Sequence, residues 1–125
     1  MIKQLPSKEI KNYIKNNPKC VLLDVRTKEE WNNGKPDGDK IGLKTHFLSI
    51  QTADERNFNE NFIQEFNNLA INQDKNILII CRSGARSQFA AELINNKENY
   101  TCINISDGFE GNQENLGWKR CNLPC

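Results

Sequence analysis

Six consecutive residues combine types that suit a reactive thiolate: Cys81, Arg82, Ser83, Gly84, Ala85 and Arg86. A cysteine is a useful nucleophile as its thiolate, and a helix N-terminus and nearby guanidinium groups both favour that form. Two of the five arginines of the chain fall within this loop. The glycine lets the backbone bend so that successive amides converge on one anion. The loop therefore predicts a small anion site around the cysteine.

Two predicted elements position this loop. The run from Asn76 to Ile80, which is apolar from Ile77 onward, is typical of a buried strand, and apolar residues recur at helical spacing from Phe89 to Ile94. In open α/β sheets, ligands gather beyond the carboxyl ends of strands, where helix N-termini present free amides. We therefore expect Cys81 to lie at the carboxyl end of a central strand.

A purely structural explanation competes with this one. Cys81 could be a buried thiol at a strand end, with Arg82 and Arg86 as ordinary surface charges. We favour the chemical interpretation, because a cysteine, a glycine and two arginines in one strand-to-helix turn form a specific combination. Ser83 and Ser87 are expected to add hydroxyl donors or to cap the helix.

The rest of the chain alternates between strand and helix patterns. Ser7 precedes an amphipathic stretch and is expected to cap a helix, while Thr27 and Glu30 have the spacing of a capping box. Apolar runs predict strands over 20–25, 76–80 and 100–105, and weakly within 41–50; a helical stripe covers 59–70. This alternation predicts one α/β domain over residues 1–125 with a mainly parallel sheet.

Composition excludes several classes of function. Seventeen basic and sixteen acidic residues give a net charge of +1, so no strong field attracts nucleic acid or an anionic membrane. The longest aliphatic run, Ile77 to Ile80, is far shorter than the roughly 20 apolar residues of a membrane span. The N-terminus lacks the apolar stretch of a secretory signal. We therefore expect a cytoplasmic protein that binds neither nucleic acid nor membrane.

The five cysteines are an odd number, and a chain without secretory features is not expected to build a disulfide framework. Cys20 and Cys102 fall in apolar runs, where a thiol packs as a small hydrophobic group. Cys121 and Cys125 form a Cys-x3-Cys pair, but no second ligand pair accompanies them and His46 is the only histidine. We expect neither a metal nor a cofactor; a redox pair among Cys102, Cys121 and Cys125 is the alternative.

Further motifs extend the pattern over most of the chain. They are Asp24-Val25-Arg26 with Glu29-Glu30-Trp31, Asp107-Gly108-Phe109-Glu110-Gly111, and Gly117-Trp118 with Leu123-Pro124. Together with the Cys81 loop, their order and spacing resemble a single-domain rhodanese. The resemblance implies a three-layer α/β fold in which helices flank a mainly parallel five-stranded sheet. It also implies a sulfurtransferase whose Cys81 takes up sulfane sulfur as a persulfide and passes it to cyanide or a thiol.

The resemblance also assigns tasks to the loop. Arg82 and Arg86 would orient a small anionic donor such as thiosulfate while Cys81 attacks its outer sulfur. The amides from Arg82 to Arg86 would point at the terminal sulfur of the persulfide and stabilise its charge.

Residues outside the loop are expected to have supporting roles. Asp24 is expected to pair with Arg86 and hold the loop in shape, with a strand-end cap or turn as an equal alternative. Arg26, Glu29, Glu30 and Trp31 are expected to be structural, and His46 to pack or face solvent. Residues 35–48 depart from the family pattern, so one edge of the sheet is not predicted.

Two other functions stay open from the sequence alone. Phosphatases or arsenate reductases of the same fold resemble this chain in placing Cys and Arg around an anion, but five residues separate the two there. Four residues separate Cys81 from Arg86, and a tighter loop favours one sulfur atom over phosphate. A non-catalytic or carrier-type module would instead pass sulfur between a protein donor and a protein acceptor. Arg56, Lys119 and Arg120 could then form part of a docking surface, or be solvated charges.

Overall fold

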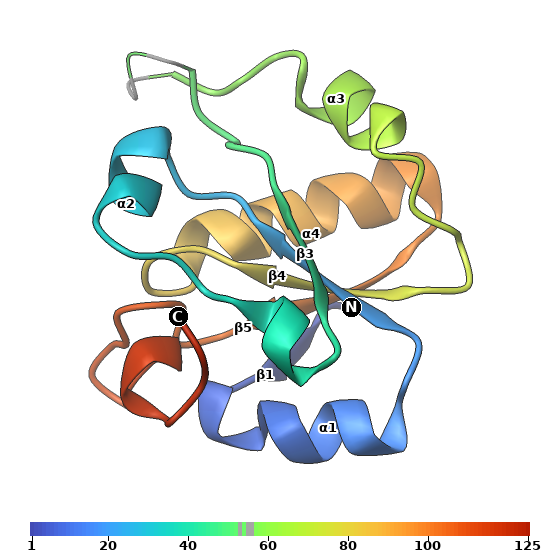
Figure 1. Ribbon diagram of the computed structural model, residues 1–125. Coiled ribbons are helices and arrows are strands. Elements are labelled where there is room, and N and C mark those ends of the chain that lie inside the picture. The colour runs from blue at the N-terminus through green and yellow to red at the C-terminus, as the bar shows by residue number, and fades with distance from the viewer. Residues whose placement is uncertain (53, 55–56) are drawn as a thin grey trace.

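The computed structural model describes residues 1–52, 54 and 57–125, and in these ranges five parallel strands form one sheet (Figure 1). The strands are β1 (Lys3–Leu5), β2 (Cys20–Asp24), β3 (Lys44–Phe47), β4 (Asn76–Ile80) and β5 (Thr101–Ile105). They lie in the order β1-β5-β4-β2-β3, and each neighbouring pair is parallel. The loops that follow the strands therefore gather at one end of the sheet. The predicted fold class is confirmed.

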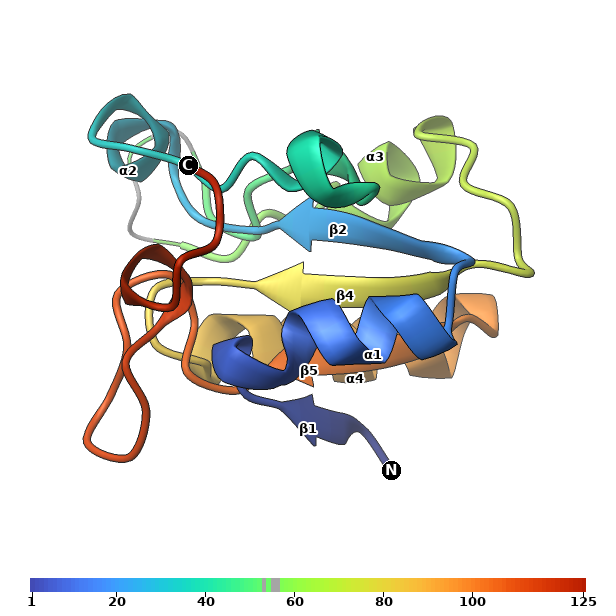
Figure 2. The same cartoon turned by 60° about the horizontal axis from the view of Figure 1, so that its bottom comes forward.

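Helices cover both faces of the sheet (Figure 2). On one face lie α3 (Phe62–Asn68) and α4 (Ala85–Glu98); on the other lie α1 (Ile10–Asn16) and the C-terminal segment around the 3-10 turn Trp118–Arg120. The short helix α2 (Lys28–Asn32) follows β2 and lies beyond the carboxyl end of the sheet. In the described part of the chain, no helix has the length and apolar character of a membrane span. The result is the three-layer architecture that the sequence predicts.

The apolar side chains of β4 alternate between two cores. Ile77 and Ile79 pack with α3 and α4, whereas Leu78 and Ile80 pack with α1 and Trp118. The four β4 side chains have 0% exposure, because a parallel strand that is covered on both faces has no side in water. This double burial explains why the sequence of β4 is a continuous apolar run.

The N-terminal segment differs from its prediction. Residues 3–5 form β1, an edge strand whose Gln4 lies beside Asn104 of β5; three residues are too few for an alternating pattern to stand out. The predicted cap by Ser7 is wrong, because Ser7 lies in the 3-10 turn Ser7–Glu9 and its side chain caps neither that turn nor α1. The α-helix begins only at Ile10.

Other predicted elements form with shorter bounds. The capping box of α2 is confirmed: Oγ1 of Thr27 accepts the N–H of Glu30 at 3.2 Å, and Oε1 of Glu30 accepts the N–H of Thr27 at 3.1 Å. The helix expected over 59–70 is α3, and the strand expected within 41–50 is β3. β3 is short because a 3-10 turn occupies Gly38–Ile41.

Asp107 joins segments that are far apart in the sequence. Its Oδ1 accepts the N–H and the hydroxyl of Ser7 at 2.9 and 2.8 Å, and its Oδ2 accepts the N–H of Gly117 at 2.9 Å. The side chain is fully buried, so these donors replace the water that the carboxylate loses on folding. Asp107 therefore ties the N-terminal turn and the C-terminal segment to the end of β5.

We expect Asp107→Ala to lower the free energy of unfolding by about 2–4 kcal/mol, because the buried donors of Ser7 and Gly117 lose their acceptor. Denaturant unfolding measures this loss. Asp74→Ala is the matched control, since Asp74 forms an exposed ion pair with Lys19 at 3.3 Å and should contribute less than about 1 kcal/mol. Equal losses in the two variants would contradict the role given to Asp107.

Candidate active site

The turn between β4 and α4 fixes the position of the predicted nucleophile. Cys81 follows β4 directly, and Gly84 precedes the first turn of α4. Gly84 has a φ of +114°, and a Cβ at this residue would lie 2.3 Å from the carbonyl oxygen of Ser106. Glycine is required here for both reasons. Its N–H donates to Sγ of Cys81 at 3.2 Å, so the sharp turn directs an amide at the sulfur.

The Cys81 thiol is enclosed but has polar neighbours. The residue is 1% exposed and belongs to the core beneath α4. Besides the Gly84 amide, Oγ of Ser87 lies 3.2 Å from the sulfur, and Ser87 is itself fully buried. This burial agrees with the explanation of Cys81 as a buried packing thiol at a strand end. The directed N–H of Gly84 is what a reactive sulfur uses, whereas in the contact with Ser87 either group can be the donor.

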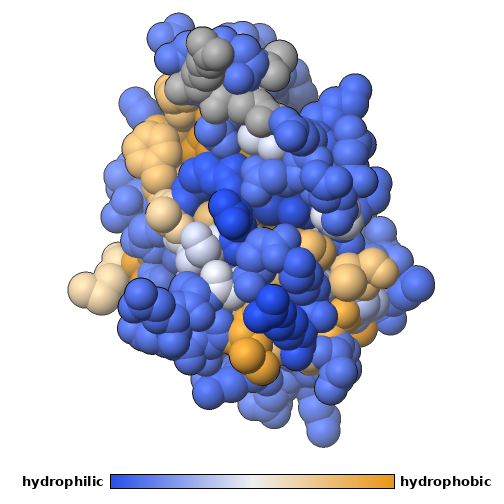
Figure 3. Space-filling view, turned by 90° about the vertical axis from the view of Figure 1, so that its left-hand side faces the viewer, coloured by the Kyte–Doolittle hydropathy of each residue, from blue (hydrophilic) through white to orange (hydrophobic). Residues whose placement is uncertain are grey.

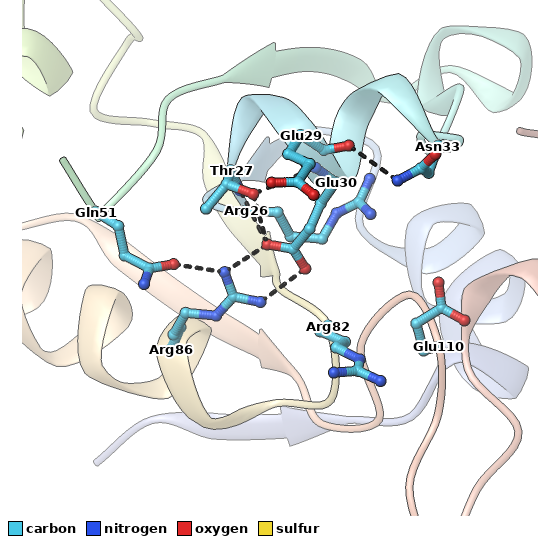
Figure 4. A pocket seen from close by; sticks show the side chains of 9 residues that line it. All are labelled: Arg26, Thr27, Glu29, Glu30, Asn33, Gln51, Arg82, Arg86 and Glu110. Carbon is cyan, nitrogen blue, oxygen red and sulfur yellow. Dashed lines mark hydrogen bonds and ion pairs between the residues drawn. The ribbon is translucent and has the colours of Figure 1, made fainter. Parts of the chain in front are cut away.

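A pocket of about 540 Å³ opens beside the loop, lined by side chains from four segments that follow strands (Figure 4). The lining residues are Arg26, Thr27, Glu29, Glu30, Asn33, Gln51, Arg82, Arg86 and Glu110. They come after β2, β3, β4 and β5, which is the end of a parallel sheet where ligands bind. Figure 3 shows the side of the molecule that lies on the left in Figure 1, and hydrophilic side chains occupy much of the centre of this face.

Arg86 is held by Glu30 and not by Asp24. Nη1 of Arg86 lies 2.7 Å from Oε1 of Glu30, and Nη2 lies 2.9 Å from Oε2, while Oε1 of Gln51 accepts from Nη1 at 2.8 Å (Figure 4). The predicted pair of Asp24 and Arg86 is therefore wrong. The same glutamate closes the capping box of α2, so α2 and α4 are joined through one carboxylate.

The ion pair of Glu30 with Arg86 shifts the pKa of both groups. Partial burial by itself would raise the pKa of Glu30, but the hydrogen bonds from Arg86 and Thr27 and the charge of Arg86 outweigh it and lower the pKa to about 2. Hydrogen bonding to Glu30 raises the pKa of Arg86. The carboxylate thus stays charged far into the acid range.

Asp24 instead holds Arg26 in a buried ion pair. Nε of Arg26 lies 3.2 and 3.1 Å from the two carboxylate oxygens, and Nη2 lies 3.1 Å from Oδ2. Burial raises the pKa of Asp24, and the Arg26 charge opposes that rise. The guanidinium also lies 4.3 Å from the ring centre of Phe109 and donates to the carbonyl of Gly34. Asp24 therefore supports the wall of the pocket, not the Cys81 loop directly.

Most charges that line the pocket are already paired. Arg26 is neutralised by Asp24 and Arg86 by Glu30, and Glu110 pairs with Lys119. Arg82 is exposed, and among the described residues it has no ion pair. Arg82 and Glu110 are both among the residues that line the pocket, and the close-up draws no ion pair between them (Figure 4). Of the two loop arginines, Arg82 is therefore the one whose charge is left for an anion.

This fold and loop agree with one protein family. The rhodanese-like domain family matches residues 7–115, a range that spans β2 to β5 and every residue that lines the pocket. The chain belongs to this family. The site of this rhodanese-like protein therefore lies within the shared domain.

Relatives and a solved structure align with most of this rhodanese-like protein. A Rickettsia prowazekii protein, "Uncharacterized protein RP600", is 42% identical over 125 residues, which cover 99% of this chain and 97% of the relative. Rhodanese-like domain-containing protein 17 of Arabidopsis thaliana is 30% identical over 82% of this chain and 60% of its own length. The crystal structure of Rv0390 from M. tuberculosis aligns with a TM-score of 0.82 and 31% identity over 98% and 95% of the two chains.

Cys81 is not among the residues that line the pocket, although its loop neighbours Arg82 and Arg86 are, and none of the other four cysteines lines it. Cys20 and Cys102 are buried, as predicted for packing thiols, and burial raises the pKa of Cys102 to about 12. Cys121 is half-buried and Cys125 is exposed. Among the described residues, no three His, Cys, Asp or Glu side chains converge as a metal site requires.

Two residues of the site escape prediction from the sequence. Glu30 is recognisable as a capping residue, but its bond to Arg86 spans 56 positions. Gln51 follows β3, where the sequence has no clear pattern. On the predicted docking surface, Lys119 pairs with Glu110 and Arg120 is exposed, while Arg56 lies outside the described residues.

We expect the stability of this rhodanese-like protein to depend on pH through Glu30. Its pKa falls from an ordinary 4.5 to about 2 on folding, so its contribution is complete above pH 4.5 and is lost as the pH falls from there toward 2. This loss should amount to about 1–3 kcal/mol. Glu30→Gln should lack that part of the pH dependence in denaturant unfolding. Glu92→Gln, an exposed change on α4, should keep that part of the pH dependence. If the free energy of unfolding varied equally with pH in the unmodified protein and in both variants, the ion pair of Glu30 with Arg86 would be contradicted.

Proposed function

We propose that this rhodanese-like protein is a sulfurtransferase that carries sulfane sulfur on Cys81. The observation that carries the proposal is the N–H of Gly84 directed at Sγ of Cys81 at 3.2 Å, at the end of the sheet where ligands bind. A backbone donor fixed in this way stabilises negative charge on sulfur without rearrangement. The adjoining pocket gives room for a donor and for an acceptor in turn.

The reaction has two displacement steps. In the first, the Cys81 thiolate attacks the outer sulfur of a donor such as thiosulfate; a new S–S bond forms, and the old S–S bond breaks with its electron pair leaving on sulfite. In the second, cyanide or a thiolate attacks the terminal sulfur of the persulfide. That step releases thiocyanate or a new persulfide and restores the Cys81 thiolate. No external oxidant or reductant is needed.

The charges around the pocket support a division of work between the arginines. Arg82 is exposed at the pocket and would bind the anionic donor. Arg86 is already committed to Glu30 and Gln51, and would keep the α4 end of the loop in place. This assignment differs from the expectation that both arginines hold the substrate.

The donor test is a mass measurement. After brief incubation with thiosulfate, the intact protein should gain one sulfur atom, about 32 Da, located on the peptide that contains Cys81. Cys81→Ser should not gain it, whereas Cys125→Ser, which removes an exposed thiol, should. A gain that persists in Cys81→Ser would contradict the proposal. A gain only from a persulfidated protein, and none from thiosulfate, would assign the carrier role instead.

A second test separates the loop arginines by steady-state kinetics. Arg82→Ala should raise the KM for thiosulfate by about tenfold, because one charge-assisted contact in a partly screened position is lost. Arg120→Ala is the control, since it removes an exposed arginine outside the pocket and should leave KM unchanged. An unchanged KM in Arg82→Ala would remove this residue from donor binding.

A further inference from the structure

The pocket beside the Cys81 loop has a charge pattern that binding of the donor does not explain. Three arginines and three glutamates line it: Arg26, Arg82, Arg86, Glu29, Glu30 and Glu110. Thiosulfate is a small dianion, and a pocket that binds only a dianion is expected to carry an excess of positive charge. The formal charges of these lining side chains instead sum to zero. The three carboxylates therefore require another explanation.

Ion pairs account for two of the three glutamates. Glu30 accepts from both terminal nitrogens of Arg86, at 2.7 and 2.9 Å, and Glu110 pairs with Lys119. Glu29 has no such partner: it is exposed, and among residues 1–52, 54 and 57–125 its carboxylate forms no ion pair. One negative charge in the lining is therefore not balanced by a neighbouring side chain.

One positive charge is left over in the same way. The other two arginines of the lining hold carboxylates of their own, whereas Arg82 has no ion pair within the described part of the chain. Glu29 and Arg82 also do not pair with each other. In the view of Figure 4 they lie on either side of the ion pair of Glu30 with Arg86. The pocket thus presents one carboxylate and one guanidinium at separate positions.

We propose that the sulfur acceptor is a small zwitterionic thiol, such as an amino-acid thiol, whose ammonium group binds Glu29 and whose carboxylate binds Arg82. This inference rests on the proposed function, because it concerns the second of the two steps. The donor leaves before the acceptor binds, so Arg82 can hold the anionic donor first and the carboxylate of the acceptor afterwards. A ligand that carries both charges gives each side chain an ionic partner.

Glu29 and Arg82 bind the acceptor and take no part in the exchange of bonds. The sulfur of the acceptor attacks the terminal sulfur of the Cys81 persulfide and forms a new S–S bond. The bond from that terminal sulfur to Sγ breaks, its electron pair stays on Sγ, and the proton of the acceptor thiol passes to the transferred sulfur. The acceptor leaves as its own persulfide. Glu29 is therefore a specificity-determining residue, and its loss should change KM and not kcat.

The test uses three acceptors that differ in charge. L-Cysteine has an ammonium group and a carboxylate, cysteamine has only the ammonium group, and N-acetylcysteine has only the carboxylate. The KM of each acceptor is measured from sulfite release at saturating thiosulfate. Because the three thiols differ in reactivity, each variant is compared with the unmodified protein on the same acceptor.

The variants should separate the two charges of the acceptor. Glu29→Gln should raise the KM about fivefold for cysteine and for cysteamine and leave that for N-acetylcysteine unchanged, because one charge-assisted contact in an exposed position is lost. Arg82→Ala should raise the KM for cysteine and N-acetylcysteine and leave that for cysteamine unchanged. Glu29→Lys should raise the KM for cysteamine and lower that for N-acetylcysteine, an inversion that a structural role would not produce.

Glu92→Gln is the matched control. It removes an exposed carboxylate that does not line this pocket and should leave all three KM values unchanged. Thermal unfolding checks that each variant is folded.

Two results would overturn the proposal. One is a Glu29→Gln protein with unchanged KM values for cysteine and cysteamine; Glu29 would then serve only the first turn of α2. The other is an equal rise for all three acceptors, which would indicate a general disturbance of the pocket. Both results leave the proposed function intact, because loading of Cys81 from thiosulfate tests that separately. Absence of such loading would overturn the two-step reaction with thiosulfate and this inference with it.

Discussion

The backbone turn at Gly84 is the constraint on which the rest of the site depends. Its φ of +114° and its close approach to the carbonyl of Ser106 leave no space for a side chain. This turn brings an N–H back onto the sulfur of Cys81 and starts α4 in the same step. The turn can be sharp because β5 and the segment after it pack directly against it. One steric requirement therefore fixes the sulfur, its amide donor and the helix.

Two polar groups contact the sulfur within this turn. The N–H of Gly84 donates to Sγ of Cys81 at 3.2 Å, and Oγ of Ser87 lies 3.2 Å from the same sulfur. The Ser87 hydroxyl also contacts Oδ1 of Asn104, so the sulfur is connected to β5 through buried polar groups. The paired charges of Arg86 and Glu30 hold the pocket wall without adding net charge.

The sequence by itself determined the elements and the reactive loop. Apolar runs located β2, β4 and β5, because strands buried on both faces must be apolar throughout. The Thr27 and Glu30 spacing located α2, because a capping box is a local interaction. Cys81 and Gly84 were recognisable because a strand-to-helix turn needs particular residue types at fixed positions. Each of these features is decided by neighbours along the chain.

Only the tertiary structure decided which side chains meet. The strand β1 has too few residues to be recognised and exists because β5 offers it an edge. Ser7 donates its hydroxyl to Asp107 and does not cap the helix. Arg86 pairs with Glu30 and not with Asp24. Asn104 of β5 accepts the hydroxyl of Ser87 only because β5 and α4 are packed together. Composition and periodicity record the burial of single residues, whereas partners between distant segments follow from how the strands and helices are assembled.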